Sequence, residues 1–155
     1  WMPDGELHKR LVEAGVHLRD FRAVLWQQGE SDVIAKATRD EYVDRLKKIQ
    51  ASAQSSWKCS PRWLLAKSTL HPTVYNEPLS ENEIRQAIDR LTHLPGFGSG
   101  PDTDLLGGIN RGPMDSRRHF SAIGQRRAAQ LWTIALWNEI NRPRPEFEVA
   151  LSHLN

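Results

Sequence analysis

The chain has 155 residues, of which 26% are charged and 39% belong to the hydrophobic set, an ordinary balance for one globular domain with its own core. Its 21 basic and 19 acidic residues leave a formal charge of +2 and are largely interspersed, so no basic field indicates a nucleic-acid partner. The single Cys59 excludes an internal disulfide, and no apolar run is long enough to indicate a membrane span. These features leave the compartment undetermined.

The start of the chain predicts a helix followed by a strand. Asp4 can cap a helix whose apolar residues share one face, namely Leu7, Leu11, Val12 and Val16. Phe21–Trp26 follows as a short apolar run, typical of a strand that is buried on both faces of a parallel sheet. Nothing before the helix resembles a first strand, and Trp1 stands where an initiator methionine would be. We therefore expect the sequence to be part of a longer protein.

The middle of the chain repeats this alternation. Helical spacing of apolar residues predicts a helix over Asp40–Gln54, and a second buried strand is expected over Arg62–Ser68. A loop over Leu70–Pro78 leads to a further helix, which we expect to begin with a capping box formed by Ser80 and Glu83.

The last third contains a loop, a long helix and a tail. Leu94–Pro113 holds most of the glycine, so we expect a long irregular loop, and Gly98–Pro101 lacks the strand that the alternation would place there. Ser121 is positioned to cap a helix over roughly Ala122 to Ile140. Residues 143–155 are interpreted as a C-terminal tail, and residues 1–142 as the domain.

The alternation of strand and helix predicts an α/β fold, with a parallel sheet covered by helices on both faces. Only two strands are recognisable, however, and two strands do not make a stable sheet. Part of the sheet is therefore expected to come from outside these residues.

A polar cluster follows the first strand and is the first candidate site. Gln28, Gly29 and Glu30 come directly after a buried strand, and open α/β folds bind ligands at the carboxyl ends of their strands. An amide there can donate to a developing oxyanion, and a buried carboxylate can hold that amide or a histidine in place. A purely structural polar network is the alternative. Ser31 can be considered as a nucleophile, but the sequence lacks G-x-S-x-G, and a helix or turn cap explains this serine better.

His119 is the second candidate. It lies just after the glycine-rich stretch and immediately before a capped helix, and Asp115 is close enough in sequence to orient its ring. A carboxylate paired with an imidazole stabilises the imidazolium that forms when the histidine takes a proton. Taken alone, His119 also fits the more common situation of a surface histidine beside an arginine pair.

No cofactor or metal site is predicted. The phosphate-binding patterns G-x-x-x-x-G-K-[ST] and G-x-G-x-x-G are both absent. The six histidines are scattered without H-E-x-x-H, and Cys59 has no cysteine partner.

Three segments together resemble one family, the sialate O-acetylesterase-like carbohydrate esterases of the SGNH hydrolase superfamily. Trp26–Asp32 is similar to their W-H-Q-G-E-S-D signature, and Gly100–Asp104 matches the G-P-D-T-D run that often precedes their catalytic loop. Asp115–Ser121 resembles their D-x-x-H-F-S segment, with Gly124 following. The resemblance implies a flavodoxin-like three-layer α/β/α sandwich that removes acyl groups, typically acetyl, from sugar hydroxyls through a serine ester.

Carried over to these positions, the resemblance implies His119 as general base and Asp115 as its orienting acid. It also implies Gln28 as the amide near the oxyanion hole, with Gly29 and Glu30 beside it. Gln27 stands where the family usually has histidine, and Asp115 precedes His119 by four residues instead of three, so Glu30 is a possible substitute acid. The nucleophile segment G-Q-S-N is absent from this sequence.

The leading hypothesis is therefore the C-terminal part of an SGNH-type carbohydrate O-acyl esterase. Its substrate would be an acylated carbohydrate or another small acyl ester, and its serine would come from a missing N-terminal segment or a second chain. The rival hypothesis is a non-catalytic relative that has lost the serine and keeps the pocket to bind a glycan or a partner. The sugar, the acyl group and the oligomeric state are not specified by the sequence.

Overall fold

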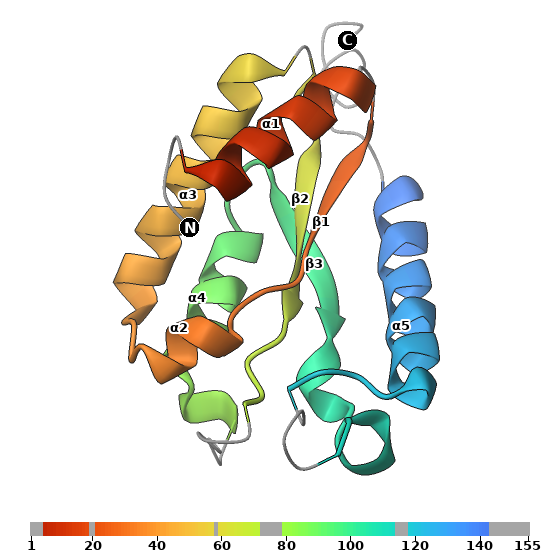
Figure 1. Ribbon diagram of the computed structural model, residues 1–155. Helices are drawn as coiled ribbons and strands as arrows, with labels where there is room; N and C mark the ends of the chain where they lie inside the picture. Colours follow the sequence, from red (N-terminus) through yellow and green to blue (C-terminus); the bar gives the residue numbers. More distant parts are fainter. Residues whose placement is uncertain (1–4, 19–20, 58, 72–78, 114–117, 143–155) are drawn as a thin grey trace, which may run out of the picture.

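The structure, a computed structural model, describes residues 5–18, 21–57, 59–71, 79–113 and 118–142 (Figure 1). Three strands alternate with helices along the chain. The strands are β1 (Ala23–Trp26), β2 (Arg62–Lys67) and β3 (Phe97–Asp102). The α-helices are α1 (Glu6–Leu18), α2 (Glu30–Ile34), α3 (Arg39–Ser56), α4 (Glu83–Thr92) and α5 (Ala122–Ile140). Short 3-10 turns are η1 (Leu79–Glu81), η2 (Thr103–Leu105) and η3 (Gly108–Asn110).

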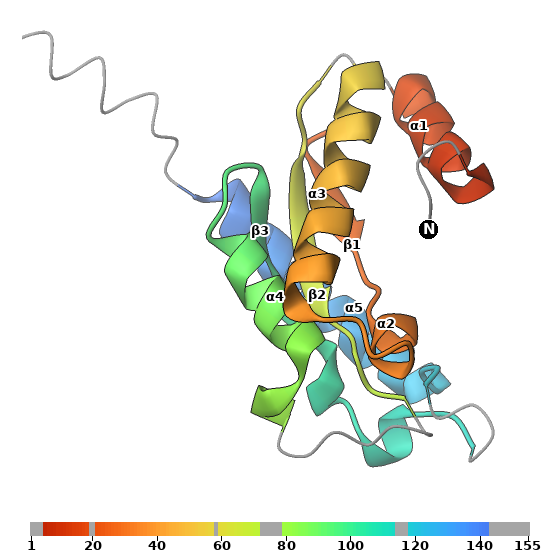
Figure 2. The ribbon, with the colours of Figure 1, turned by 90° about the vertical axis from the view of Figure 1, so that its left-hand side faces the viewer.

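The strands form one parallel sheet in the order β1-β2-β3. Figures 1 and 2 show α3 and α4 on one face of this sheet, with α1 beside α3, and α5 on the other face. The arrangement is an α/β architecture with helices on both sides of the sheet, consistent with the flavodoxin-like fold of SGNH type. The expectation of this fold class is confirmed.

The core lies mainly between the sheet and the pair α3 and α4. Trp63 and Leu65, two positions apart in β2, lie on the sheet face that carries α3 and α4. Both are buried with apolar residues of these helices and with Phe97 of β3. Each large aromatic side chain of this cluster, such as Trp63 and Phe97, removes a large apolar area from water. Among the described residues, no helix is both long and apolar enough to cross a membrane.

Several predicted elements are confirmed closely. β2 begins at the predicted Arg62, and α5 begins after the predicted N-cap Ser121, whose side chain accepts a hydrogen bond from the Gly124 amide at 3.1 Å. The predicted helix over Asp40–Gln54 is α3. Its N-cap is Thr38, which forms a reciprocal capping box with Glu41.

The prediction of an irregular loop over residues 98–101 is wrong, because this segment is the middle of β3. Its composition is poor for a strand, but its glycines allow a very close approach to β2. A Cβ atom at Gly100 would lie 2.7 Å from the backbone nitrogen of Ala66. Pairing with β2 therefore decides the conformation here, against the intrinsic preference of the residues.

Two predictions about helices need correction. In α1 the buried positions are His8 and Gly15, whereas Leu7 and Val16 are 59% and 53% exposed, because Gly15 packs against the ring of Trp57, the residue that follows α3. α4 begins at Glu83 with Asn82 as its N-cap, two residues after the predicted cap at Ser80.

The strand predicted over Phe21–Trp26 is shorter and is not buried on both faces. β1 is an edge strand of the described sheet, and its Leu25 is 46% exposed on the face that carries α5. Residues 143–155, interpreted as a tail, lie outside the described residues, as do residues 72–78 of the predicted loop.

Candidate active site at the carboxyl end of the sheet

The turn from β1 into α2 carries three predicted site residues. Gly29 is buried, and a Cβ atom there would lie 2.7 Å from the carbonyl oxygen of Ser68, so only glycine lets the turn rest against the end of β2. The next residue, Glu30, accepts a hydrogen bond from the Ser68 hydroxyl at 2.7 Å. The turn is thus fixed to the residues that follow β2, and the Glu30 carboxylate is held in a defined place.

Gln28 lies in this turn and is half-buried. Its side-chain amide donates to the carboxylate of Asp32, and its backbone carbonyl oxygen accepts a hydrogen bond from the Tyr42 hydroxyl at 2.9 Å. Burial raises the pKa of Tyr42 well above its usual value, so this hydroxyl stays protonated and remains a donor. An amide carries two N–H groups, and Gln28 can therefore donate to Asp32 and to a second acceptor.

A buried ionic network lies behind this turn, at the ends of β2 and β3. The carboxylate of Asp104 accepts hydrogen bonds from the Thr69 amide and hydroxyl at 2.7 and 2.6 Å, and from Arg85 at 2.8 Å. Arg85 also forms a bidentate pair with Asp102 at 2.6 and 2.8 Å. Hydrogen bonding to Asp102 is the main reason that the pKa of Arg85 is raised, ahead of the contribution from Asp104. The network joins α4 to two strand ends.

His119 is exposed and lies in the segment that precedes α5. Its Nε2 accepts a hydrogen bond from Arg118 Nε at 3.1 Å, which assigns the proton of the neutral ring to Nδ1. Its carbonyl oxygen accepts a hydrogen bond from the Gly112 amide at 2.9 Å. The ring can therefore present a lone pair on Nε2 while Nδ1 is available to an orienting acid. Asp115, the predicted acid, lies outside the described residues.

The structure brings both candidate segments to the same end of the sheet, the lower end in Figures 1 and 2. Trp132 of α5 donates to the side chain of Gln27 at 2.8 Å, which links the end of β1 to the helix that follows His119. Arg111, which precedes His119, is close enough to Glu30 for that carboxylate to act on its pKa. No direct contact joins Glu30 to His119 among the described residues.

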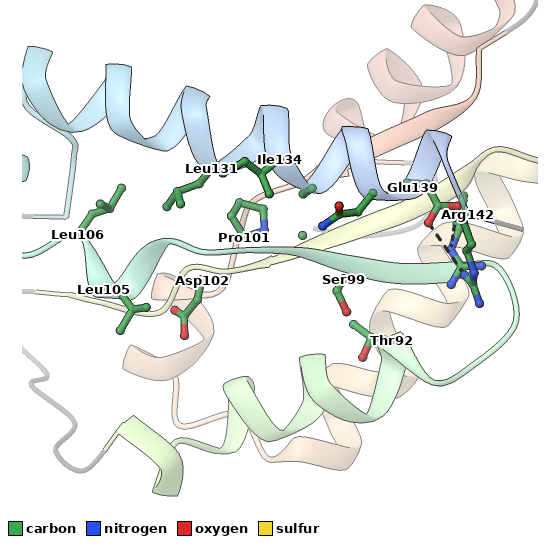
Figure 3. A pocket seen from close by; sticks show the side chains of 14 residues that line it. Thr92, Ser99, Pro101, Asp102, Leu105, Leu106, Leu131, Ile134, Glu139 and Arg142 are labelled. Atoms are coloured by element: carbon green, nitrogen blue, oxygen red, sulfur yellow. Dashed lines mark ion pairs between the residues drawn. The ribbon is translucent and has the colours of Figure 1, made fainter.

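A groove of about 640 Å³ lies elsewhere, along the outer edge of β3 (Figure 3). It is lined by strand residues that include Ser99 and Pro101, by Thr92 of α4 and by residues of α5 such as Ile134. None of Gln28, Glu30 and His119 lines this groove. This groove is therefore separate from the candidate site.

Two arginines of the site were not predicted from the sequence. Arg85 and Arg111 are both buried. Arg85 pairs with a carboxylate that is distant in the chain, and Arg111 donates to backbone carbonyls. Asp104 gave a weak signal as the last residue of the Gly100–Asp104 run, but the strand that precedes it was not predicted. For the described residues, no group of three or more His, Cys, Asp or Glu side chains is arranged to hold a metal ion.

These features define an α/β protein whose polar groups meet at the carboxyl end of a parallel sheet, where such folds bind ligands. A sequence model of the family described as "Carbohydrate esterase, sialic acid-specific acetylesterase" matches residues 1–91, more than half of the 155 residues. The chain belongs to this carbohydrate esterase family. The match includes the segment with Gln28 and Glu30 and ends before β3 and His119. Comparisons with curated proteins and with solved structures gave no significant match.

Proposed function

We propose that this chain is the part of a carbohydrate O-acyl esterase that supplies the general base and the oxyanion amide. One observation carries the proposal: the segment after β1, which holds Gln28, and the segment before α5, which holds His119, lie at the same end of the sheet in a chain of a carbohydrate esterase family. The acyl group is acetyl, in agreement with the description of that family. The substrate is an acylated carbohydrate or a related small ester.

In the proposed mechanism, His119 Nε2 takes the proton of a serine hydroxyl as the serine oxygen attacks the acyl carbonyl carbon. The carbonyl oxygen becomes an oxyanion, and the free N–H of Gln28 donates to it. The tetrahedral intermediate then expels the sugar oxygen, which receives the proton from the imidazolium. Water, activated by the same histidine, releases acetate and regenerates the serine. Arg118 is exposed, so its side chain can leave Nε2 without breaking a buried contact.

The serine of this mechanism belongs to a segment outside the 155 residues, because G-Q-S-N does not occur in them. The outer edge of β1 supports this part of the proposal, because within the described sheet β1 pairs with β2 alone. β1 contains neither proline nor charge, and its exposed Leu25 offers an apolar surface to an added strand. A parallel strand paired there would end beside Gln28.

The opposite edge of the sheet is built differently, which favours β1 as the place of addition. β3 contains Pro101, which has no N–H to donate, and two glycines that offer no side chain to pack. An edge of this kind resists pairing with another strand, whereas β1 contains neither proline nor glycine.

The second candidate function is a non-catalytic relative that binds a glycan or a partner. The absence of G-Q-S-N from the sequence favours it as much as it favours a serine supplied from elsewhere. Reading the coding sequence upstream of Trp1 separates the two. An in-frame G-Q-S-N there supports the esterase, and its absence, together with a full-length protein that does not hydrolyse acyl esters, supports the binding protein.

The direct test is His119→Ala in the full-length protein, assayed with short acetyl esters. Loss of the base should lower kcat by about three orders of magnitude or more. His93→Ala is the matched control, because His93 is also exposed but caps the C-terminal end of α4, and it should leave turnover unchanged. Near-normal turnover of the His119 variant would refute the assignment of the base.

A further inference from the structure

Arg111 has an unusual environment for a buried cation. Its guanidinium has three backbone carbonyl partners: Nε donates to Leu106 at 2.8 Å, one terminal nitrogen to Arg118 at 3.0 Å and the other to Thr103 at 2.8 Å. Among the described residues no carboxylate forms an ion pair with it. Burial lowers the pKa of Arg111, although Asp104 and Glu30 act in the opposite direction. A buried guanidinium without a paired carboxylate is costly, which points to a specific role.

The three carbonyls belong to two segments of the chain. Thr103 and Leu106 follow directly on β3, whereas Arg118 precedes His119. The guanidinium also lies 4.3 Å from the centre of the Phe120 ring, in cation–π geometry. Arg111 therefore contacts the residue on each side of His119 and ties both to the end of β3.

Backbone pairing completes this attachment. Arg111 forms an antiparallel bridge with Phe120, and the Gly112 amide donates to the His119 carbonyl at 2.9 Å. On the other side of the bridge, the Ser121 amide donates to the Asn110 carbonyl at 2.9 Å. His119 is thus held by its main chain on a two-stranded bridge, while its ring stays exposed.

We propose that Arg111 is a positioning residue that fixes His119 at the carboxyl end of β3. This inference rests on the proposed function, in which His119 is the general base. The requirement for arginine follows from geometry, because a planar guanidinium reaches three carbonyls and stacks on a ring at the same time. A lysine ammonium keeps the charge but cannot satisfy carbonyls on both segments together.

The test compares Arg111→Lys with Arg127→Lys in the full-length protein. Arg127 is the matched control, because it also carries a guanidinium near this bridge but donates to the side chain of Asn110 at 2.8 Å and, among the described residues, forms no hydrogen bond with a residue beside His119. Arg111→Lys should lower kcat about 100-fold, since a displacement of about 1 Å in a reacting group has that effect. KM should stay within about threefold, because substrate contacts are not removed. Arg127→Lys should change neither constant.

A double-mutant cycle separates positioning of His119 from a general structural effect. In the His119→Ala background, Arg111→Lys should cause no further loss of kcat, since the group that it positions is absent. An equal 100-fold loss in both backgrounds would overturn the proposal. So would a KM increase with unchanged kcat.

Hydrogen exchange of the Gly112 amide gives a readout that does not depend on activity. Its protection should fall in folded Arg111→Lys and persist in Arg127→Lys, because the bond to His119 opens when the guanidinium no longer holds the two segments. Unchanged protection would overturn the positioning role. If protection of the Gly112 amide falls in Arg111→Lys but His119→Ala keeps full activity, the proposed function is refuted. Arg111 would then position the His119 segment without any effect on catalysis.

Discussion

Two polar regions share the carboxyl end of the sheet, and they differ in burial and in the number of their partners. In the first region the Asp104 carboxylate is fully buried and accepts hydrogen bonds from Thr69, which follows β2, and from Arg85 of α4. The His119 segment is exposed, and its ring has one side-chain partner, Arg118, among the described residues. The first region suits a scaffold, whereas the second leaves a titratable nitrogen accessible to a reacting group. The comparison therefore separates residues that should control stability from residues that should control turnover.

The largest effect on stability is expected at Asp104. Asp104→Ala would leave the Thr69 amide and hydroxyl without their buried acceptor and would remove one of the two carboxylates that pair with Arg85, so we expect a loss of about 3–5 kcal/mol in the free energy of unfolding. Asp104→Asn keeps the shape of the side chain and should lower the free energy of unfolding by less. Denaturant titration measures both values, and Asp40→Ala is the control, because Asp40 pairs with Arg90 at the surface and should cost less than about 1 kcal/mol. Equal losses at Asp104 and Asp40 would remove the distinction between the two regions.

The next effect concerns turnover and Gln28. Gln28→Ala removes the proposed oxyanion donor, and we expect kcat to fall about 10²- to 10³-fold. Gln86→Ala is the control, because its amide donates only to the Ser80 carbonyl at the surface and should not affect kcat. Steady-state kinetics on an acetyl ester in the full-length protein tests this. A Gln28 variant that loses stability but keeps kcat would move Gln28 from the reactive region to the scaffold.

The smallest effect is expected at the capping box of α3, which provides a reference for ordinary local stabilisation. Thr38→Ala should cost about 1 kcal/mol, because the Glu41 amide loses its acceptor. Hydrogen bonds from Thr38 hold the pKa of Glu41 below its usual value. A lowered pKa in the folded state means that this contribution is present above the unfolded pKa and is lost as pH falls through the folded pKa. The difference in unfolding midpoint between wild type and Glu41→Gln should therefore shrink in acid, and a constant difference would contradict this.

The predictability of the fold depended on whether an element carries its own local signal. α5 was predicted to the residue, because Ser121 is a good N-cap and a long helical pattern follows it. β3 was not predicted, because its glycines and proline disfavour a strand. These residues adopt a strand conformation only because they pair with the adjacent backbone of β2.

The same distinction applies to the candidate site. The position of Glu30 after a strand was readable from the sequence, but its partner Ser68 lies 38 residues away and follows another strand. Arg111 gave no signal at all, since its partners are backbone carbonyls, which every residue has. Sequence pattern thus indicated which groups are polar at the strand ends, whereas the contacts that fix them arise only from tertiary structure.

The central claim is that His119 activates a serine that lies outside these 155 residues. A fluorophosphonate probe tests it directly, because such probes react with a serine that a neighbouring base has activated. The full-length protein is labelled, digested and mapped by mass spectrometry, with His119→Ala in parallel. We predict label on one serine outside the 155 residues and its loss in the His119 variant. Label on Ser31, label that is unaffected by His119→Ala, or a protein that takes up no label would contradict the account.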